Sequence, residues 1–157
     1  LSASSLFLLT IVMIIGASPS GTGGGIKTTS ITALWAVMMS VMRRRSQVTF
    51  LRREIPDARV RAAVANVSFY ALTLAAGVYA LAFVETAPLP DQMFECASAR
   101  GTVGLSRGIT GTLSDWGKGI IIALMFLGRV GPLALGMALI RRGAPGQDEH
   151  PEEDVAI

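Results

Sequence analysis

Apolar residues gather in three stretches of the chain, and polar segments separate these stretches. Residues 62–84 are 23 consecutive positions without a formal charge. A helix of that length, rising ~1.5 Å per residue, can cross ~30 Å of hydrocarbon. Residues 119–140 add 22 positions with a single charge among them, at Arg129. We therefore expect a transmembrane helix over each of these two ranges.

The first apolar stretch is interrupted. Residues 6–15 and 31–42 are each too short to cross a membrane alone. The segment 16–29 between them is rich in glycine and in hydroxyl side chains. The pattern predicts one span within residues 1–45, broken at mid-depth by the Gly-rich loop 16–29.

A polar segment over residues 88–107 joins the two longer spans. Pro90 and Asp91 predict a short helix here, because proline suits the first turn of a helix and a carboxylate interacts favourably with its amino-terminal dipole. A glycine-containing segment follows this helix. A short helix that enters the membrane and an extended return are typical of a pore loop, whose non-helical backbone must be lined by protein or water. The alternative interpretation is an ordinary extracellular loop with a glycine turn.

These elements predict an all-α membrane protein. Residues 62–141 would form a span-pore-span arrangement, with a re-entrant pore helix and filter loop at 88–107 between spans 62–84 and 119–140. Residues 1–45 would supply the broken span. The composition agrees, because 51% of the residues are hydrophobic and only 16% are charged, against about 25% charged in average chains.

The chain has few residues that suit catalysis or metal binding. Cys96 is its one cysteine and His150 its one histidine. This excludes a disulfide framework within the chain and a cysteine-based zinc site. No nucleophile and base are assembled by the sequence, so we expect neither an enzyme nor a covalently bound cofactor.

The charges predict an orientation, because short loops rich in Lys and Arg stay in the cytoplasm. Residues 43–61 contain seven arginines and two acids, which predicts that the basic loop 46–61 is cytoplasmic. The acidic tail 142–157 is expected to be disordered and to lie on the same side. The chain would thus be a multi-pass protein of the plasma (inner) membrane with a cytoplasmic carboxy terminus. Contact with anionic lipid headgroups explains the arginines better than nucleic-acid binding does. The acids between the two long spans would lie outside: Glu85, Asp91, Glu95 and Asp115.

The run from Thr102 to Leu105 is close to the filter sequence of potassium channels, in which a row of carbonyl oxygens replaces the hydration shell of the ion. Glycine suits such a strand because it adopts backbone geometries that a side chain would hinder. The candidate ion-binding residues are Gly101, Thr102, Val103, Gly104 and Leu105.

The Gly-rich loop does not fit a phosphate-binding loop, because Ile26 separates Gly25 from Lys27 and no strand-helix-strand context surrounds it. Broken helices of this kind line ion routes in transporters. A flexible hinge or a tight helix crossing remains the alternative. Arg129 would cost about 2.5 to 3.5 kcal/mol at mid-span and should therefore face a cavity or a partner.

Three motifs occur in order at residues 15–29, 98–106 and 125–133. Together they resemble the Trk/Ktr/HKT superfamily of potassium transporters, in particular its TrkH/KtrB-type membrane subunits. The resemblance implies four repeats of span, pore helix, filter loop and span around one pore. Residues 6–42 would then be the second span of repeat three, and 62–140 would be repeat four. The N-terminal repeats would be missing, so the chain would be an incomplete pore.

The resemblance also implies a function and partners. The chain would transport potassium or another monovalent cation through a filter of backbone carbonyls, in the lipid bilayer, as a homodimer. A cytosolic nucleotide-binding (RCK-type) regulatory subunit would bind it, and nucleotide would act only through that subunit. The alternative is a structural or regulatory membrane subunit that does not transport. An intramembrane gate would comprise Ser20, Gly21, Thr22, Gly23, Gly24, Gly25, Lys27 and Arg129.

Two cations depart from the pattern of the resembled family. Arg100 precedes the candidate filter and Arg107 follows it. They would oppose the entry of cations unless they point into the protein or pair, for instance with Glu95 or Asp115. Leu105 stands where potassium channels have tyrosine, which implies weaker discrimination between K⁺ and Na⁺.

Overall fold

The computed structural model describes every residue except 1, 17, 19–22, 45–48, 51–52 and 141–157. The described part is helical apart from one antiparallel pair of two-residue strands. The elements in chain order are α1 (Ala3–Ile14), α2 (Thr28–Met42), β1 (Thr49–Phe50), β2 (Arg53–Glu54), α3 (Asp57–Val84), α4 (Leu89–Gly101) and α5 (Asp115–Ile140).

Helix α3 is the element that most resembles a membrane span. Within the described residues it is the helix that is both long and apolar enough to cross a bilayer, and two shorter apolar helices cover Ser4–Ile14 and Thr28–Met42. Pro56 precedes α3, and Asp57 lies in its first turn, where the helix dipole favours a carboxylate. The helix therefore begins before residue 62, and residues 57–61 of the expected loop are helical.

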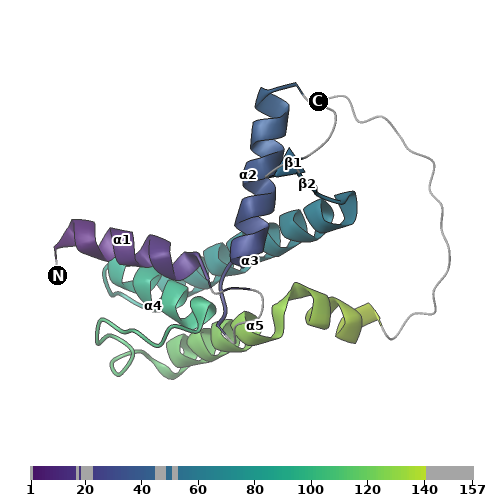
Figure 1. Ribbon diagram of the computed structural model, residues 1–157. Coiled ribbons are helices and arrows are strands. Elements are labelled where there is room, and N and C mark those ends of the chain that lie inside the picture. Colours follow the sequence, from purple (N-terminus) through teal and green to yellow (C-terminus); the bar gives the residue numbers. More distant parts are fainter. Residues whose placement is uncertain (1, 17, 19–22, 45–48, 51–52, 141–157) are drawn as a thin grey trace.

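Helix α4 lies between α1 and α5 and also packs on α3 (Figure 1). Its first turn contains Pro90 and Asp91, as the sequence predicts, and the helix continues to Gly101. Two small cores hold it in place. One joins α3, α4, the segment before α5 and α5 itself through Leu81, Cys96, Ala99, Leu113, Ile121 and Leu124; the other joins α1 to α4 through Met13, Phe94 and Ala97.

The loop between α3 and α4 stabilises the start of α5. Both the backbone N–H of Ser114 and its hydroxyl donate hydrogen bonds to one Glu85 carboxylate oxygen, at 2.8 and 2.6 Å. Ser114 in turn accepts a bond from the N–H of Gly117 at 3.2 Å, as an N-cap residue does. Further along, α5 packs closely on α3, because a Cβ added at Gly77 would meet Leu124 at 2.7 Å.

The Gly-rich segment separates α1 from α2, which packs on α3 and extends away from α1, α4 and α5 in Figure 1. Its two ends are held together by a parallel bridge between Ile15 and Ile26. Gly16 donates its N–H to the carbonyl of Ile26 at 2.9 Å, and Ile26 donates to Ile14 at 3.0 Å. Glycine is required here, since a Cβ on Gly16 would lie 2.1 Å from the carbonyl oxygen of Gly24. The segment is thus a closed loop at its base.

Candidate functional site

The candidate filter begins where α4 ends. Gly101 is the last residue of that helix and does not belong to the extended segment. Thr102 is left-handed, with φ 55° and ψ 36°, and donates its N–H to Ala99 at 3.2 Å. Val103 donates its N–H to Ser98 at 3.0 Å. These two bonds terminate the helix with a left-handed residue and release the chain into a non-helical return segment, which we define as residues 103–113.

Within the return segment, Gly104 has φ +82°, a conformation that L side chains rarely adopt, and no atom lies within 4 Å of a Cβ added there. The need for glycine at this position is therefore conformational and not steric. Val103 and Leu105 on either side are exposed. Among the described residues, none donates a hydrogen bond to the backbone carbonyls of 102–105.

The Gly-rich segment and the candidate filter meet directly. Gly24 donates its N–H to the Thr102 hydroxyl at 2.6 Å, although 78 positions separate them. A Cβ on Gly24 would lie 3.1 Å from the carbonyl oxygen of Arg100. A Cβ on Gly128 of α5 would lie 2.5 Å from the same oxygen. The carboxyl end of α4 is therefore the point where the Gly-rich segment and α5 converge.

Four of the other candidate gate residues lie in the part of the chain that the structure describes. Gly23 is exposed, Gly25 has φ +88° close to Gly16, and Lys27 is the exposed residue that precedes α2. Arg129 is exposed on α5, next to Gly128. Ser20, Gly21 and Thr22 lie outside the described residues.

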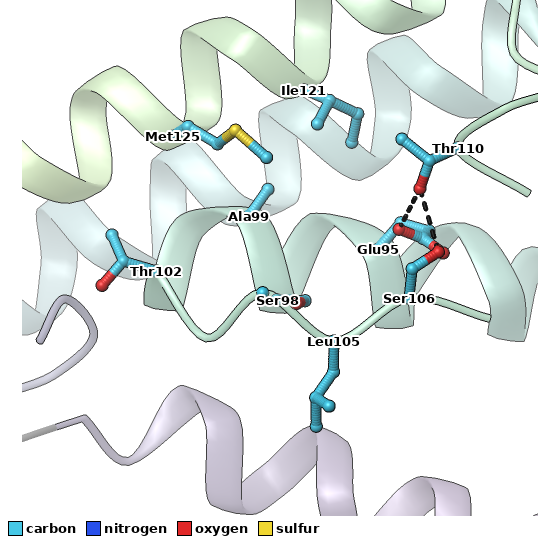
Figure 2. Close-up of a pocket in the computed structure, with 10 residues that line it drawn as sticks. Glu95, Ser98, Ala99, Thr102, Leu105, Ser106, Thr110, Ile121 and Met125 are labelled. Atoms are coloured by element: carbon cyan, nitrogen blue, oxygen red, sulfur yellow. Dashed lines mark hydrogen bonds between the residues drawn. The ribbon is translucent and has the colours of Figure 1, made fainter. Parts of the chain in front are cut away.

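A buried carboxylate connects α4 to the return segment (Figure 2). Glu95 is only 4% exposed. One of its oxygens accepts hydrogen bonds from the Ser106 hydroxyl at 2.6 Å and from the Arg107 N–H at 2.8 Å, and the other accepts from the Thr110 hydroxyl at 2.8 Å. The guanidinium of Arg107 also forms an ion pair with Asp91 in the first turn of α4. The sequence suggested pairing for Arg107, but not this partner.

Arg100 points into the protein, which is one of the two arrangements expected for it. The residue is 3% exposed, and its Nε donates to the Thr73 hydroxyl of α3 at 3.0 Å. Its guanidinium lies over the rings of Tyr70 and Phe69, at 4.9 and 5.5 Å from their centroids. Cation–π contacts of this kind are worth more when they are desolvated. Neither Glu95 nor Asp115 contacts it, since the structure places its charge against α3.

A cavity of about 580 Å³ lies between α4, the return segment and α5 (Figure 2). No group of three or more His, Cys, Asp or Glu side chains within the described ranges could hold a metal ion. The cavity is lined by Glu95, Ser98, Ala99, Thr102, Gly104, Leu105, Ser106, Thr110, Ile121 and Met125.

The described part of the chain is helical apart from one short strand pair and contains a helix that is long and apolar enough to cross a membrane, which is consistent with a membrane transporter. The chain belongs to the TrkH family of cation transport proteins, whose family model matches residues 1–143. This is a family of transporters and not of enzymes, which confirms the expectation from the sequence.

Curated relatives cover the whole chain. It is 35% identical over 157 residues to Ktr system potassium uptake protein D of Bacillus subtilis, which is 100% of this chain and 35% of that protein. It is 32% identical over 151 residues to Ktr system potassium uptake protein B of Vibrio alginolyticus, 96% of this chain and 33% of the relative. It is 32% identical over 164 residues to potassium/sodium uptake protein NtpJ of Enterococcus hirae, 100% of this chain and 36% of the relative. The chain thus spans about a third of the length of these relatives.

Proposed function

We propose that the chain forms part of a transmembrane pathway for monovalent cations, with potassium as the main transported ion. The observation that carries this proposal is the backbone of residues 102–105, whose carbonyls no described hydrogen bond engages and whose conformation depends on Gly104. Backbone carbonyl oxygens in a row can replace the water around an ion. The names of the relatives, which are potassium and potassium/sodium uptake proteins, support the same conclusion.

Residues 101–105 are proposed as one part of the selectivity filter, with α4 as a re-entrant pore helix. Gly101 is the helical end of this unit, and the ion would contact mainly the carbonyls that follow it. Leu105 leaves the filter without the tyrosine of potassium channels. We therefore expect modest discrimination between K⁺ and Na⁺, in line with a relative named for both ions.

The Gly-rich segment, residues 20–27, is proposed as a gate together with Arg129. The hydrogen bond from Gly24 to Thr102 supports this role, because it attaches the segment to the end of the candidate filter. Arg129 follows Gly128, which contacts the same helix end. A positive charge near the ion path would add an electrostatic barrier to cations.

The remaining proposals concern the assembly. The pore would be completed by N-terminal repeats outside this chain, and the full protein would lie in the plasma membrane as a homodimer with its carboxy terminus in the cytoplasm. A nucleotide-binding (RCK-type) subunit would regulate it from the cytosol. Relatives named as parts of a Ktr system are consistent with a transporter that works in a complex.

The test is growth of a potassium-uptake-deficient bacterial strain at low external K⁺, with the full-length gene product expressed in it. We expect growth to be restored by the unaltered protein and abolished by Gly104→Ser. The matched control is Gly111→Ser, because position 111 is also open and has no positive φ. If growth is not restored by an expressed, membrane-inserted protein, a subunit without transport activity is the better conclusion.

A further inference from the structure

The first half of the return segment, residues 103–108, has few contacts that fix its position. Residues 102–108 are all exposed, and a Cβ added at Gly104 or Gly108 would meet nothing within 4 Å. The first end of the candidate filter is fixed by the two bonds that terminate α4 and by the bond from Gly24 to Thr102. After Leu105, the described hydrogen bonds and the ion pair to α4 come from Glu95 and Asp91, and further along Leu113 packs in the core with Cys96 and Ala99.

Glu95 provides most of these contacts. Its carboxylate accepts three hydrogen bonds that reach positions 106, 107 and 110, at 2.6 to 2.8 Å. The Ser106 hydroxyl oxygen lies 3.0 Å from that of Thr110 and accepts from the N–H of Gly108 at 2.9 Å, so the turn closes around the carboxylate. Hydrogen bonds to an ionised acceptor are shorter and stronger than neutral ones.

We propose that Glu95 is the positioning residue that fixes the far end of the candidate filter and so sets its selectivity; this inference rests on the proposed function. Discrimination between two ions of equal charge depends on where the carbonyl oxygens are held. A filter segment fixed only at Val103 could shift its carbonyls to fit either ion. With Glu95 holding Ser106 and Arg107, the backbone of the intervening residues is fixed at both ends.

Two substitutions of Glu95 separate the effect of its hydrogen bonds from the effect of its negative charge. In Glu95→Gln, the amide oxygen can still accept from the Arg107 N–H and the Ser106 hydroxyl. The amide nitrogen can donate to the Thr110 hydroxyl, because a hydroxyl both donates and accepts. In Glu95→Ala, all three donors lose their acceptor. The two variants should therefore differ, although both remove the same negative charge.

The experiment measures uptake of K⁺ and of Na⁺ by the full-length gene product in proteoliposomes and compares their ratio among variants. We expect Glu95→Ala to lower the K⁺-to-Na⁺ ratio to nearly one, because all three donors lose their acceptor and the filter carbonyls are no longer held in place for either ion. Glu95→Gln should keep the ratio within about twofold of the unaltered protein. Asp115→Ala, which removes an exposed acid at the start of α5, is the matched control and should leave the ratio unchanged.

The ratio is informative because a merely destabilised protein transports less of both ions without changing their ratio. An unchanged ratio in Glu95→Ala overturns the inference, and so does a fall in Glu95→Gln as large as that in Glu95→Ala. If Glu95→Ala does not reach the membrane, the double variant Ser106→Ala/Thr110→Val removes two donors and keeps the carboxylate. An unchanged ratio in that variant overturns the inference as well. Absence of K⁺ uptake by the unaltered protein would instead contradict the proposed function.

Discussion

A substitution at Gly128 tests how closely α5 approaches the carboxyl end of α4. A Cβ at this position would lie 2.5 Å from the carbonyl oxygen of Arg100 and 3.3 Å from the methyl carbon of Thr102. The first of these atoms belongs to the backbone of α4 and cannot rotate away. In Gly128→Ala, α5 and α4 must therefore move apart.

Two opposing effects determine how Gly128→Ala changes the free energy of unfolding. Overpacking in a tightly packed region costs about 1 to 3 kcal/mol. Alanine is favoured over glycine inside a helix by about 0.5 to 1 kcal/mol. Gly119 lies in the same helix and has nothing within 4 Å of an added Cβ, so Gly119→Ala should show only the favourable effect. The free energies of unfolding of the two variants should thus differ by about 1 to 3 kcal/mol, with Gly128→Ala the less stable.

The assay is thermal unfolding of the full-length protein in detergent, followed by tryptophan fluorescence, with the two variants prepared side by side. We expect a lower transition temperature for Gly128→Ala than for the unaltered protein and an equal or higher one for Gly119→Ala. Equal transition temperatures in the two variants would refute the close approach of α5 to the carbonyl of Arg100.

Three further substitutions test neighbouring contacts. Thr102→Val removes the acceptor for the Gly24 N–H while keeping the side-chain shape; we expect higher ion flux in proteoliposomes, and unchanged flux would argue against a gate held by this bond. Thr73→Val leaves the buried Arg100 without its hydroxyl partner and should lower the free energy of unfolding by about 1 to 3 kcal/mol, whereas Arg100→Met should be nearly neutral; equal losses in chemical unfolding would contradict this asymmetry. Arg129→Ala should raise flux at normal expression, and equal or lower flux would count against an electrostatic barrier.

Features that depend on residues close together in the sequence could be predicted from the sequence alone. The interruption of the first apolar stretch follows from its glycines, and α1 ends at Ile14 while α2 begins at Thr28. The short helix begins where Pro90 and Asp91 predict it. Helix α3 begins after Pro56, before the expected span 62–84, because Arg59 and Arg61 interrupt the apolar stretch but not the helix.

The contacts of Arg107 could have been found by a length argument. Four extended residues from 103 to 106 cover about 13 Å, whereas α-helical residues rise ~1.5 Å each, so the return runs back past about nine residues of α4. That distance brings position 106 level with residues 92–93, within one helical turn of Glu95. Asp91, one helical turn earlier, is then within reach of Arg107.

Other contacts could not be predicted. The bond between Gly24 and Thr102 joins positions 78 residues apart, and no local pattern indicates which glycine approaches which hydroxyl. The direction of Arg100 depends on the aromatic rings of Tyr70 and Phe69 on another helix. Both are consequences of helix packing, which the sequence alone does not specify.

We propose that the backbone of residues 102–105 binds the transported cation. A crystal structure of the full-length protein soaked in Rb⁺, with anomalous scattering used to locate the ion, would show this binding. We expect Rb⁺ in contact with carbonyl oxygens of this segment, and loss of that ion in Gly104→Ser. A transport-competent protein whose Rb⁺ sites all lie away from these carbonyls would contradict this proposal.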